Sequence, residues 1–381
     1  MVLGGLATLF FLRFWHAEAN IARPDGTRLV SISFRGPEGS HDTLIVAMPA
    51  WYGPQRHPRL PLVISPHSRG VTASANARRW GGIPGRFGLI VLNPGLHGRI
   101  IKGRSWAWPA EVSETVDLLG VVRRSIPYLR YDPDRVYAIG HSMGGQEALM
   151  DLVHQPDVFA AVVAVDPVTN FVDRWYDFPH SALSKGQQRA ATQEVGSTPR
   201  RKPWLYVQRS PLFFARTIAF SAVAVQLWWN PKDTVVITEG RDQAGALYRT
   251  VRRLNPRAPI YDRIHHEMHG YVFRYDRDLP EMVRFLRRFR RHGPPAHGFS
   301  YESWSRSASV WGWDVRAGAV RRKPWRLDFV TRLGFRSVSP VMLRVRPPVA
   351  PVAAFVDGRR VPVKAGAVRV LAGRHDVRLV P

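Results

Sequence analysis

Residues 140–145, with the sequence Gly-His-Ser-Met-Gly-Gly, form the pattern in this chain that is most typical of a catalytic serine. Residues 135–139 before it read as a short buried strand, and residues 146–153 after it read as a helix. A serine on a sharp turn between a strand and a helix projects its hydroxyl from the sheet, an arrangement called a nucleophile elbow. Side chains at positions 140 and 144 would collide with the turn, which explains both glycines. The pattern therefore predicts Ser142 as a nucleophile.

A serine hydroxyl is a weak nucleophile near neutral pH, so it needs a histidine base that is oriented by a carboxylate. Asp233 lies in a turn soon after the apolar run 222–229, at the carboxyl end of an expected strand. His269 lies further along the chain, and its neighbour Gly270 relieves crowding in a loop that must reach back to Ser142. This order of serine, acid and histidine is a known one for such sites. We therefore predict Asp233 as the acid and His269 as the base.

Other residues compete for these roles. Asp166 ends the preceding expected strand and is the rival acid, while Asp233 is also typical of an ordinary turn. His265 and His266 compete with His269 as the base, and we expect them to be structural or to line the pocket. Three close histidines also suggest a metal site. However, adjacent residues of an extended strand point to opposite faces, and the His-Glu-x-x-His pattern of zinc helices is absent. We therefore expect no metal and no cofactor.

In their order and spacing, these residues resemble the α/β-hydrolase superfamily, and more closely the catalytic domain of its prolyl-oligopeptidase-like branch. The similarity covers about residues 27–292. The resemblance implies an α/β fold, with a mostly parallel sheet flanked by helices. It also implies Ser142 as nucleophile, Asp233 as acid and His269 as base. The matching stretches are residues 60–67, 140–145, 209–211, 233–236 and 269–271, with Gln243, Leu247 and Tyr248 in the helix that follows the acid.

The resemblance also implies an oxyanion hole. A tetrahedral intermediate needs two aimed donors, usually the backbone N–H after the nucleophile and one from the loop after the third strand. The first donor is the N–H of Met143. The second comes from residues 66–70, where Ser68 stands in place of the glycine that is typical of the family. Either Ser68 or Arg69 therefore supplies this N–H.

Together these features predict a serine hydrolase that cleaves carboxylic esters through an acyl-enzyme intermediate. Prolyl oligopeptidases carry a β-propeller ahead of the hydrolase domain, and residues 1–26 contain no blade repeats. Many propeller-free relatives are esterases, and esters are easier to hydrolyse than amides. The alternative enzyme is a prolyl-oligopeptidase-like serine peptidase, so the expected partner is a small or oligomeric ester or amide. The alternative of another class is an inactive hydrolase-fold protein that binds through its C-terminal part.

With 381 residues, 45% of them hydrophobic, the chain is long enough for a sizeable core and a second unit. Residues 1–26 form an N-terminal segment, and residues 27–292 form the catalytic domain. Residues 293–299 are rich in glycine and proline and read as a linker. Residues 300–381 read as a β-sandwich-like accessory module. Within the catalytic domain, the long insertion at residues 167–210 predicts a cap that shapes the substrate pocket.

The accessory module shows short alternating runs of apolar residues, and Asp357-Gly358 between two of them is a hairpin signal. The module is rich in tryptophan, which offers two interpretations. Exposed indoles would bind a polymer or glycan, whereas buried ones would fill a small core or the interface with the catalytic domain. We favour the second interpretation for Trp304, Trp311, Trp313 and Trp325.

The formal net charge is +26, which ordinarily suggests nucleic acid or an anionic surface as a partner. The basic residues are scattered along the sequence, and no helix-turn-helix, zinc-finger or RNA-binding motif accompanies them. We therefore expect no specific nucleic-acid partner. The basic run 284–291 is mainly a solvated helix face, with weak contact to anionic surfaces as the alternative. No pattern in the sequence fixes an oligomeric state.

The start of the chain resembles a secretory signal. Residues 2–12 are apolar, and residues 17–19, with the sequence Ala-Glu-Ala, fit a cleavage site. The segment is too short to span a bilayer. The absence of cysteine suits an exported protein without disulfides as well as a cytoplasmic one. We expect an extracytoplasmic or secreted protein, with a cytoplasmic location as the alternative.

Overall fold

The computed structural model of the chain describes residues 15–22, 25–35, 41–95, 106–270, 277–291, 293, 298–318, 323–331 and 334–380. The apolar segment 2–12, most of the predicted linker and Tyr271 lie outside these described residues. Residues 17–19, the predicted cleavage site, lie in the first strand, which pairs with the next strand. None of the described helices is long and apolar enough to cross a membrane.

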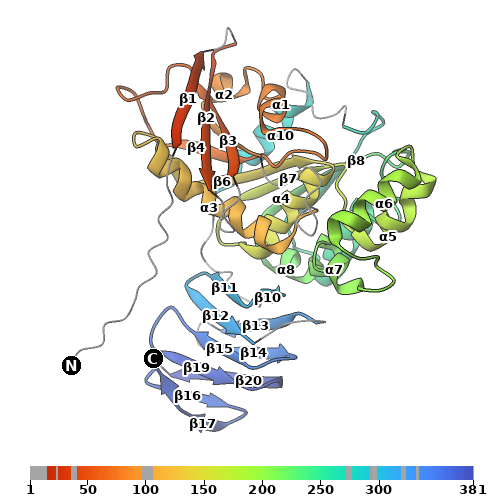
Figure 1. The fold of residues 1–381 in the computed structure, drawn as a ribbon. Coiled ribbons are helices and arrows are strands. Elements are labelled where there is room, and N and C mark those ends of the chain that lie inside the picture. The colour runs from red at the N-terminus through yellow and green to blue at the C-terminus, as the bar shows by residue number, and fades with distance from the viewer. Residues whose placement is uncertain are drawn as a thin grey trace.

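A nine-stranded sheet with the order β1-β2-β3-β5-β4-β6-β7-β8-β9 forms the centre of the molecule (Figure 1). From β5 through β4 to β9 all neighbouring strands are parallel, whereas β1, β2 and β3 extend the sheet by antiparallel pairing. Strands β4, β5, β7 and β8 are buried along their whole length, as expected for strands with both faces covered. The strands are β1 Trp15–Ala22, β2 Thr27–Arg35, β3 His41–Pro49, β4 Leu60–Ile64, β5 Ile90–Pro94, β6 Tyr131–His141, β7 Ala161–Val165, β8 Ala224–Trp229 and β9 Ile260–Ile264.

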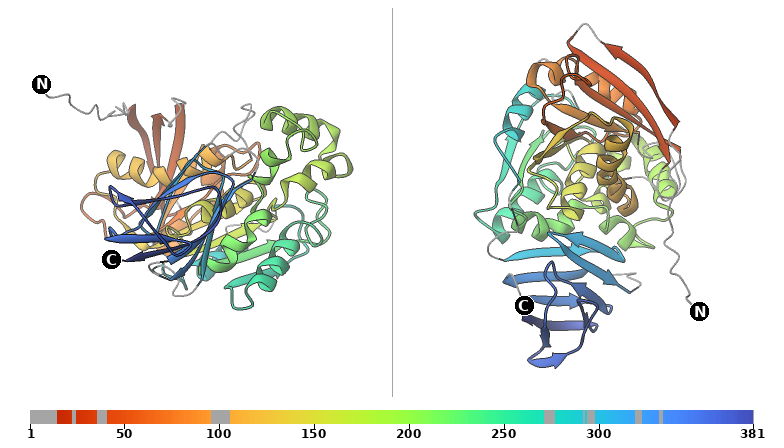
Figure 2. Two further views of the ribbon diagram at one scale, coloured as in Figure 1. Left: turned by 90° about the horizontal axis from the view of Figure 1, so that it is seen from below. Right: turned by 90° about the vertical axis from the view of Figure 1, so that its left-hand side faces the viewer.

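Helices cover both faces of this sheet (Figure 2). Alternate residues of a strand point to opposite faces, so Leu62 and Ile64 join one core cluster while Val63 joins the other. The first cluster packs against α3, α4, α8 and α9, and the second against α2 and α10. The last helix ends at Leu286, so it contains only the first part of the basic run 284–291. The helices are α1 Ala73–Arg79, α2 Ile83–Phe87, α3 Pro109–Ser125, α4 Met143–His154, α8 Ala215–Phe220, α9 Ala244–Leu254 and α10 Asp278–Leu286.

The predicted cap region is helical and lies to one side of the sheet (green in Figure 1). It consists of α5 Phe171–Asp177, η1 Phe178–His180, α6 Ser184–Val195 and α7 Pro203–Val207, and η2 Pro211–Phe214 follows it. Its buried side chains share an apolar cluster with Trp106, with Met143 at the start of α4 and with Val236 after β8. The region therefore packs against both the serine turn and the acid turn.

The C-terminal residues form two antiparallel sheets that share one apolar core, as a β-sandwich does. The six-stranded sheet has the order β10-β13-β14-β20-β16-β17, and the five-stranded sheet has the order β11-β12-β15-β19-β18. This arrangement confirms the predicted fold class. The strands are β10 Phe299–Ser303, β11 Ser307–Val310, β12 Trp313–Ala317, β13 Trp325–Thr331, β14 Gly334–Ser339, β15 Leu343–Arg346, β16 Ala353–Val356, β17 Arg359–Val361, β18 Val363–Lys364, β19 Ala367–Val370 and β20 Gly373–Val380.

The hairpin and the tryptophans of this module follow their sequence signals. Asp357 and Gly358 join β16 to β17 with φ angles of 50° and 79°, as a tight hairpin turn requires. Trp313 and Trp325 belong to the module's own core, and Trp311 packs edge-on against Phe299. Trp304 instead joins the core of the catalytic part. The indoles thus fill the core and the interface, which confirms the second interpretation.

Candidate active site

Ser142 occupies the turn between β6 and α4, where its backbone is held at φ 58° and ψ −122°. A Cβ at Gly140 would lie 2.1 Å from the carbonyl oxygen of Gly144, and a Cβ at Gly144 would lie 2.3 Å from that of Pro66. The predicted need for glycine at these positions is therefore confirmed. The N–H of Ser142 donates to the carbonyl of Val165, which ties the strained turn to β7.

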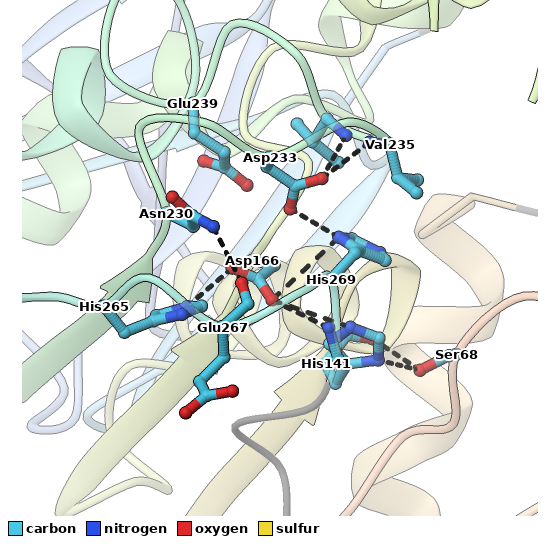
Figure 3. Close-up of polar contacts among 12 residues, drawn as sticks. Ser68, His141, Asp166, Asn230, Asp233, Val235, Glu239, His265, Glu267 and His269 are labelled. Carbon is cyan, nitrogen blue, oxygen red and sulfur yellow. Dashed lines mark hydrogen bonds and ion pairs between the residues drawn. The ribbon is translucent and has the colours of Figure 1, made fainter. Parts of the chain in front are cut away.

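Asp233 and His269 form a buried acid–base pair (Figure 3). The Nδ1 atom of His269 lies 2.7 Å from Oδ2 of Asp233, and Oδ1 of Asp233 accepts the backbone N–H groups of Val235 and Val236 at 2.6 and 3.0 Å. Burial alone favours the neutral acid, but the hydrogen bonds to His269, Val235 and Val236 lower the pKa of Asp233 below its usual value. Asp233 is therefore a carboxylate that faces the imidazole.

The ring of His269 lies beside the serine turn. Nε2 is buried and has no hydrogen-bond partner among the described residues. The ring centroid lies 4.7 Å from that of His141, which directly precedes Ser142. No hydrogen bond joins Ser142 to His269 in the described part of the chain, and such contacts are often long until substrate binds. The structure thus pairs Asp233 with His269 and sets His269 beside the turn of Ser142. The proton transfer between the last two stays a prediction.

Asp166, the rival acid, lies next to the pair of Asp233 and His269. It directly follows β7 and is fully buried, with Oδ1 2.9 Å from Nε2 of His265 and Oδ2 accepting the N–H of Gly270 at 3.0 Å. Its distance to Nδ1 of His269 is 3.9 Å, whereas Asp233 is at 2.7 Å. The geometry therefore favours Asp233 as the partner of His269. Asp166 instead fastens both ends of the loop that carries this histidine.

The predicted oxyanion donors lie on both sides of the serine turn. Met143 is the first residue of α4, and the first N–H groups of a helix have no acceptor within it. The hydroxyl of Ser68 is engaged with His141, at 2.6 Å from its Nδ1 and 3.0 Å from its carbonyl oxygen. Burial, and then the nearby His269, lower the pKa of His141 well below its usual value, so this ring is neutral. Whether Ser68 or Arg69 offers the second N–H stays a prediction.

Comparison with known proteins agrees with this architecture. Residues 87–221 match the prolyl oligopeptidase family. The chain has the α/β-hydrolase fold. Similar solved structures include a puromycin-hydrolysing peptidase of Mycobacterium tuberculosis, with 18% identity, a TM-score of 0.55, and coverage of 70% of this chain and 40% of that one. A ferulic acid esterase has 16% identity, a TM-score of 0.54, and coverage of 69% and 98%.

An S-formylglutathione hydrolase of Agrobacterium tumefaciens has 15% identity, a TM-score of 0.52, and coverage of 72% of this chain and 99% of that one. No curated protein matches the sequence significantly. The chain spans about 40% of the length of the puromycin-hydrolysing peptidase. These findings confirm the resemblance in fold, and both peptidases and esterases are among the structural neighbours.

Sequence reasoning missed one buried acid beside the candidate site. Glu239 accepts the N–H of Ala244 through Oε2, while Oε1 is buried with no hydrogen-bond partner among the described residues. Burial, and then the charges of Asp166 and Asp233, raise the pKa of Glu239 well above its usual value. The residue is therefore a neutral acid behind the pair. Glu239 lies in a loop and belongs to no recognisable motif. The sequence therefore offers no signal that would identify this residue.

Within the described part of the chain, two groups of side chains have ligand atoms close enough for a metal ion, within 4.8 Å of one another. One is His141, Asp166 and His269, and the other is Asp166, Asp233 and Glu239. Asp166 already accepts from His265 and Gly270, and Asp233 from His269 and two backbone N–H groups. A cation at either place would have to displace these hydrogen bonds.

The cap region is fastened to the loop that holds the predicted second oxyanion donor. Arg69 forms an ion pair with Glu194 of α6, which is itself buried, and a hydrogen bond with Gln187. Trp106 donates its indole N–H to the other carboxylate oxygen of Glu194, and the guanidinium of Arg69 lies 5.6 Å from the Trp106 ring. The position of α6 is therefore coupled to that of the loop after β4.

Proposed function

We propose that this α/β-hydrolase cleaves carboxylic esters through an acyl-enzyme, with Ser142, His269 and Asp233 as its catalytic triad. One observation carries the proposal. His269 is paired with the buried carboxylate of Asp233 through Nδ1, and its ring packs against His141, which directly precedes Ser142 in the strained turn. Its Nε2 has no hydrogen-bond partner among the described residues, as a general base that receives a proton requires. Other histidines also have a buried nitrogen without a partner, so the pairing with Asp233 beside the serine turn is what distinguishes His269.

In the proposed reaction, Nε2 of His269 takes the proton of Ser142 as the serine oxygen attacks the ester carbonyl carbon. Asp233 keeps the proton of His269 on Nδ1 and stabilises the imidazolium that forms. The N–H of Met143 and a donor from Ser68 or Arg69 stabilise the oxyanion. The ester C–O bond then breaks and His269 gives its proton to the departing alcohol. Water, activated by the same base, releases the acid from the acyl-serine.

The preference for esters rests on chemistry and on the extent of the structural similarity. An ester carbonyl is more reactive than an amide, so a triad without dedicated peptide subsites favours esters. The structural match to this chain includes 98% of the ferulic acid esterase and 99% of the S-formylglutathione hydrolase. It includes only 40% of the puromycin-hydrolysing peptidase. The match of residues 87–221 to the prolyl oligopeptidase family favours a second candidate, a serine peptidase.

The first test is labelling with a fluorophosphonate, together with turnover of p-nitrophenyl esters and of aminoacyl-p-nitroanilides. Ser142→Ala should lose the label and at least about 10⁴-fold in ester turnover. Ser74→Ala, at an exposed serine of α1, is the matched control and should retain both. A label that persists in Ser142→Ala would refute the nucleophile. An unlabelled, folded wild type would favour the inactive binding protein. Anilide turnover above that of every ester would favour the peptidase.

A further inference from the structure

A row of arginines crosses the outer face of the five-stranded sheet in the C-terminal module. Strands β12, β15 and β19 lie side by side in this sheet (Figure 1). Their antiparallel register places Arg316 directly opposite Arg344, and Arg344 directly opposite Arg369. The neighbouring apolar residues of the same strands point into the core, so all three arginines share the exposed face. Neighbouring strands are about 4.8 Å apart, which sets the spacing of the row.

Within the row, each arginine has another arginine and no acidic residue directly opposite it: Arg344 lies between Arg316 and Arg369. Like charges directly opposite each other destabilise a sheet. Arg346 and Lys364 add two more cations beside the row, and Asp314 lies directly opposite Arg346. Among the described residues, none of the five forms an ion pair, and the hydrogen bonds of Arg344 and Arg369 go to neutral acceptors, the carbonyl of Lys364 and the sulfur of Met342. The fold thus maintains an unfavourable arrangement that a bound anion would relieve.

The row lies in a recess rather than on a flat surface. One cavity of about 460 Å³ contains Arg316, Arg344 and Arg346. A second cavity of about 770 Å³ contains Lys364 and Arg369, and shares Arg344 with the first. We name these two adjoining cavities, with their five cations, the basic groove. The first cavity is rich in hydroxyl groups, from Tyr301, Ser305, Ser307 and Ser309, and also contains Asp314. The second has an apolar floor of Met342, Val361, Pro362 and Leu371.

We propose that the basic groove binds a single chain of an acidic polysaccharide. Arginine pairs with carboxylates in a planar, bidentate manner, so successive uronate groups would neutralise the row. The serine hydroxyls and Asp314 suit sugar hydroxyls, and the apolar floor suits the C–H faces of sugar rings. A recess does not fit a flat bilayer. A single-stranded nucleic acid needs exposed rings on which its bases stack, whereas the aromatic residues that line the groove, His154 and Tyr301, are buried.

The groove is distant from the proposed chemistry. Helix α4 begins directly after Ser142 and ends at His154, which lines the groove. Its 12 residues span about 18 Å at the usual rise of a helix. A polymer in the groove would therefore anchor the whole molecule and would not hold the scissile bond. This inference is independent of the proposed esterase activity, because binding can be measured with no turnover.

The test compares two variants of the full chain with equal loss of charge. The groove variant carries Arg316→Gln, Arg344→Gln and Arg369→Gln. The control variant carries Arg359→Gln, Arg360→Gln and Arg374→Gln, three exposed arginines of the six-stranded sheet. Binding to polygalacturonate, poly-dT and neutral dextran is measured by titration calorimetry at several salt concentrations. Turnover of a small p-nitrophenyl ester and the thermal midpoint check that both variants fold.

We expect wild type and the control variant to bind polygalacturonate alike and to ignore dextran. The groove variant should bind polygalacturonate at least about tenfold more weakly, since a lost charge-assisted hydrogen bond is worth roughly that factor. Its affinity should also depend less steeply on salt. Equal weakening in both variants would overturn the proposal, because net charge alone would then explain binding. Tighter binding of poly-dT than of polygalacturonate, lost in the groove variant, would overturn it in favour of nucleic acid.

Discussion

Gly270 offers a sharp test of how the loop positions the base. It follows His269, has a φ angle of 79°, and an added Cβ would lie 2.6 Å from Cε1 and 2.8 Å from Nε2 of His141. The ring of His141 has little room to move, since Ser68 binds its Nδ1 and the ring of His269 packs against it. In Gly270→Ala the backbone beside His269 must therefore shift.

Gly270→Ala should lower the free energy of unfolding for two reasons. A left-handed backbone costs an alanine roughly 1–2 kcal/mol relative to glycine. Overpacking against a buried ring adds about 1–3 kcal/mol. The matched control is Gly88→Ala at the end of α2, where φ is 61° and no described atom lies within 4 Å of the added Cβ. Gly88→Ala should therefore show only the first of these costs, about 1–2 kcal/mol.

The assay measures kcat/KM for a p-nitrophenyl ester and the free energy of unfolding in urea, for wild type and both variants. A displacement of about 1 Å at a catalytic group can cost about 10²-fold in rate. We therefore expect Gly270→Ala to lose about that factor in kcat/KM, while Gly88→Ala stays close to wild type. If Gly270→Ala keeps wild-type turnover and loses no more stability than Gly88→Ala, contact with His141 does not position the base.

Three further predictions test neighbouring contacts. Asp233→Asn should lower kcat by about 10⁴-fold, as loss of an orienting carboxylate does in serine proteases, whereas a larger loss in Asp166→Asn would reverse their roles. Glu194→Gln should lower the free energy of unfolding in urea, because it breaks a buried ion pair. The loss should lie near the lower end of the usual range of about 3–5 kcal/mol, since Arg69, the partner of Glu194, is 22% exposed. Unchanged stability would refute the proposed coupling of α6 to the loop after β4. Burial lowers the pKa of His154 to about 4, against about 6.5 in the unfolded chain. Between about pH 4 and pH 6.5 the folded chain therefore binds fewer protons than the unfolded chain. The free energy of unfolding should thus be fully retained above pH 6.5 and fall by roughly 3 kcal/mol toward pH 4, and the same fall in His154→Gln would refute this assignment.

The serine turn was predictable because its constraints are local. A strained strand-to-helix turn leaves no space for Cβ atoms at Gly140 and Gly144, so the sequence itself records the geometry. The acid turn after β8 is similar, because Asp233 lies four residues after the end of its strand and accepts the next backbone N–H groups. Both features depend on residues that are only a few positions apart.

The surroundings of the site were not predictable, because they depend on contacts between distant segments. The contact of Ser68 with His141 and the pair of His265 with Asp166 form only when separate strands align in the sheet. No local pattern distinguishes a histidine that binds Asp166 from one that binds Asp233. Glu239 is a stronger case, since its neutral state results from burial beside two carboxylates that lie elsewhere in the sequence.

The basic groove shows the same limit for charge. Along the sequence the arginines are scattered, which predicted no specific nucleic-acid partner and at most weak contact with anionic surfaces. Strands place alternate residues on one face, and antiparallel pairing aligns those faces across the sheet. Arg316, Arg344 and Arg369 come from three separate strands and become direct neighbours only through this register. A cationic surface on a β-sheet is therefore defined by the strand register. Arginines that are scattered along the sequence are no evidence against such a surface.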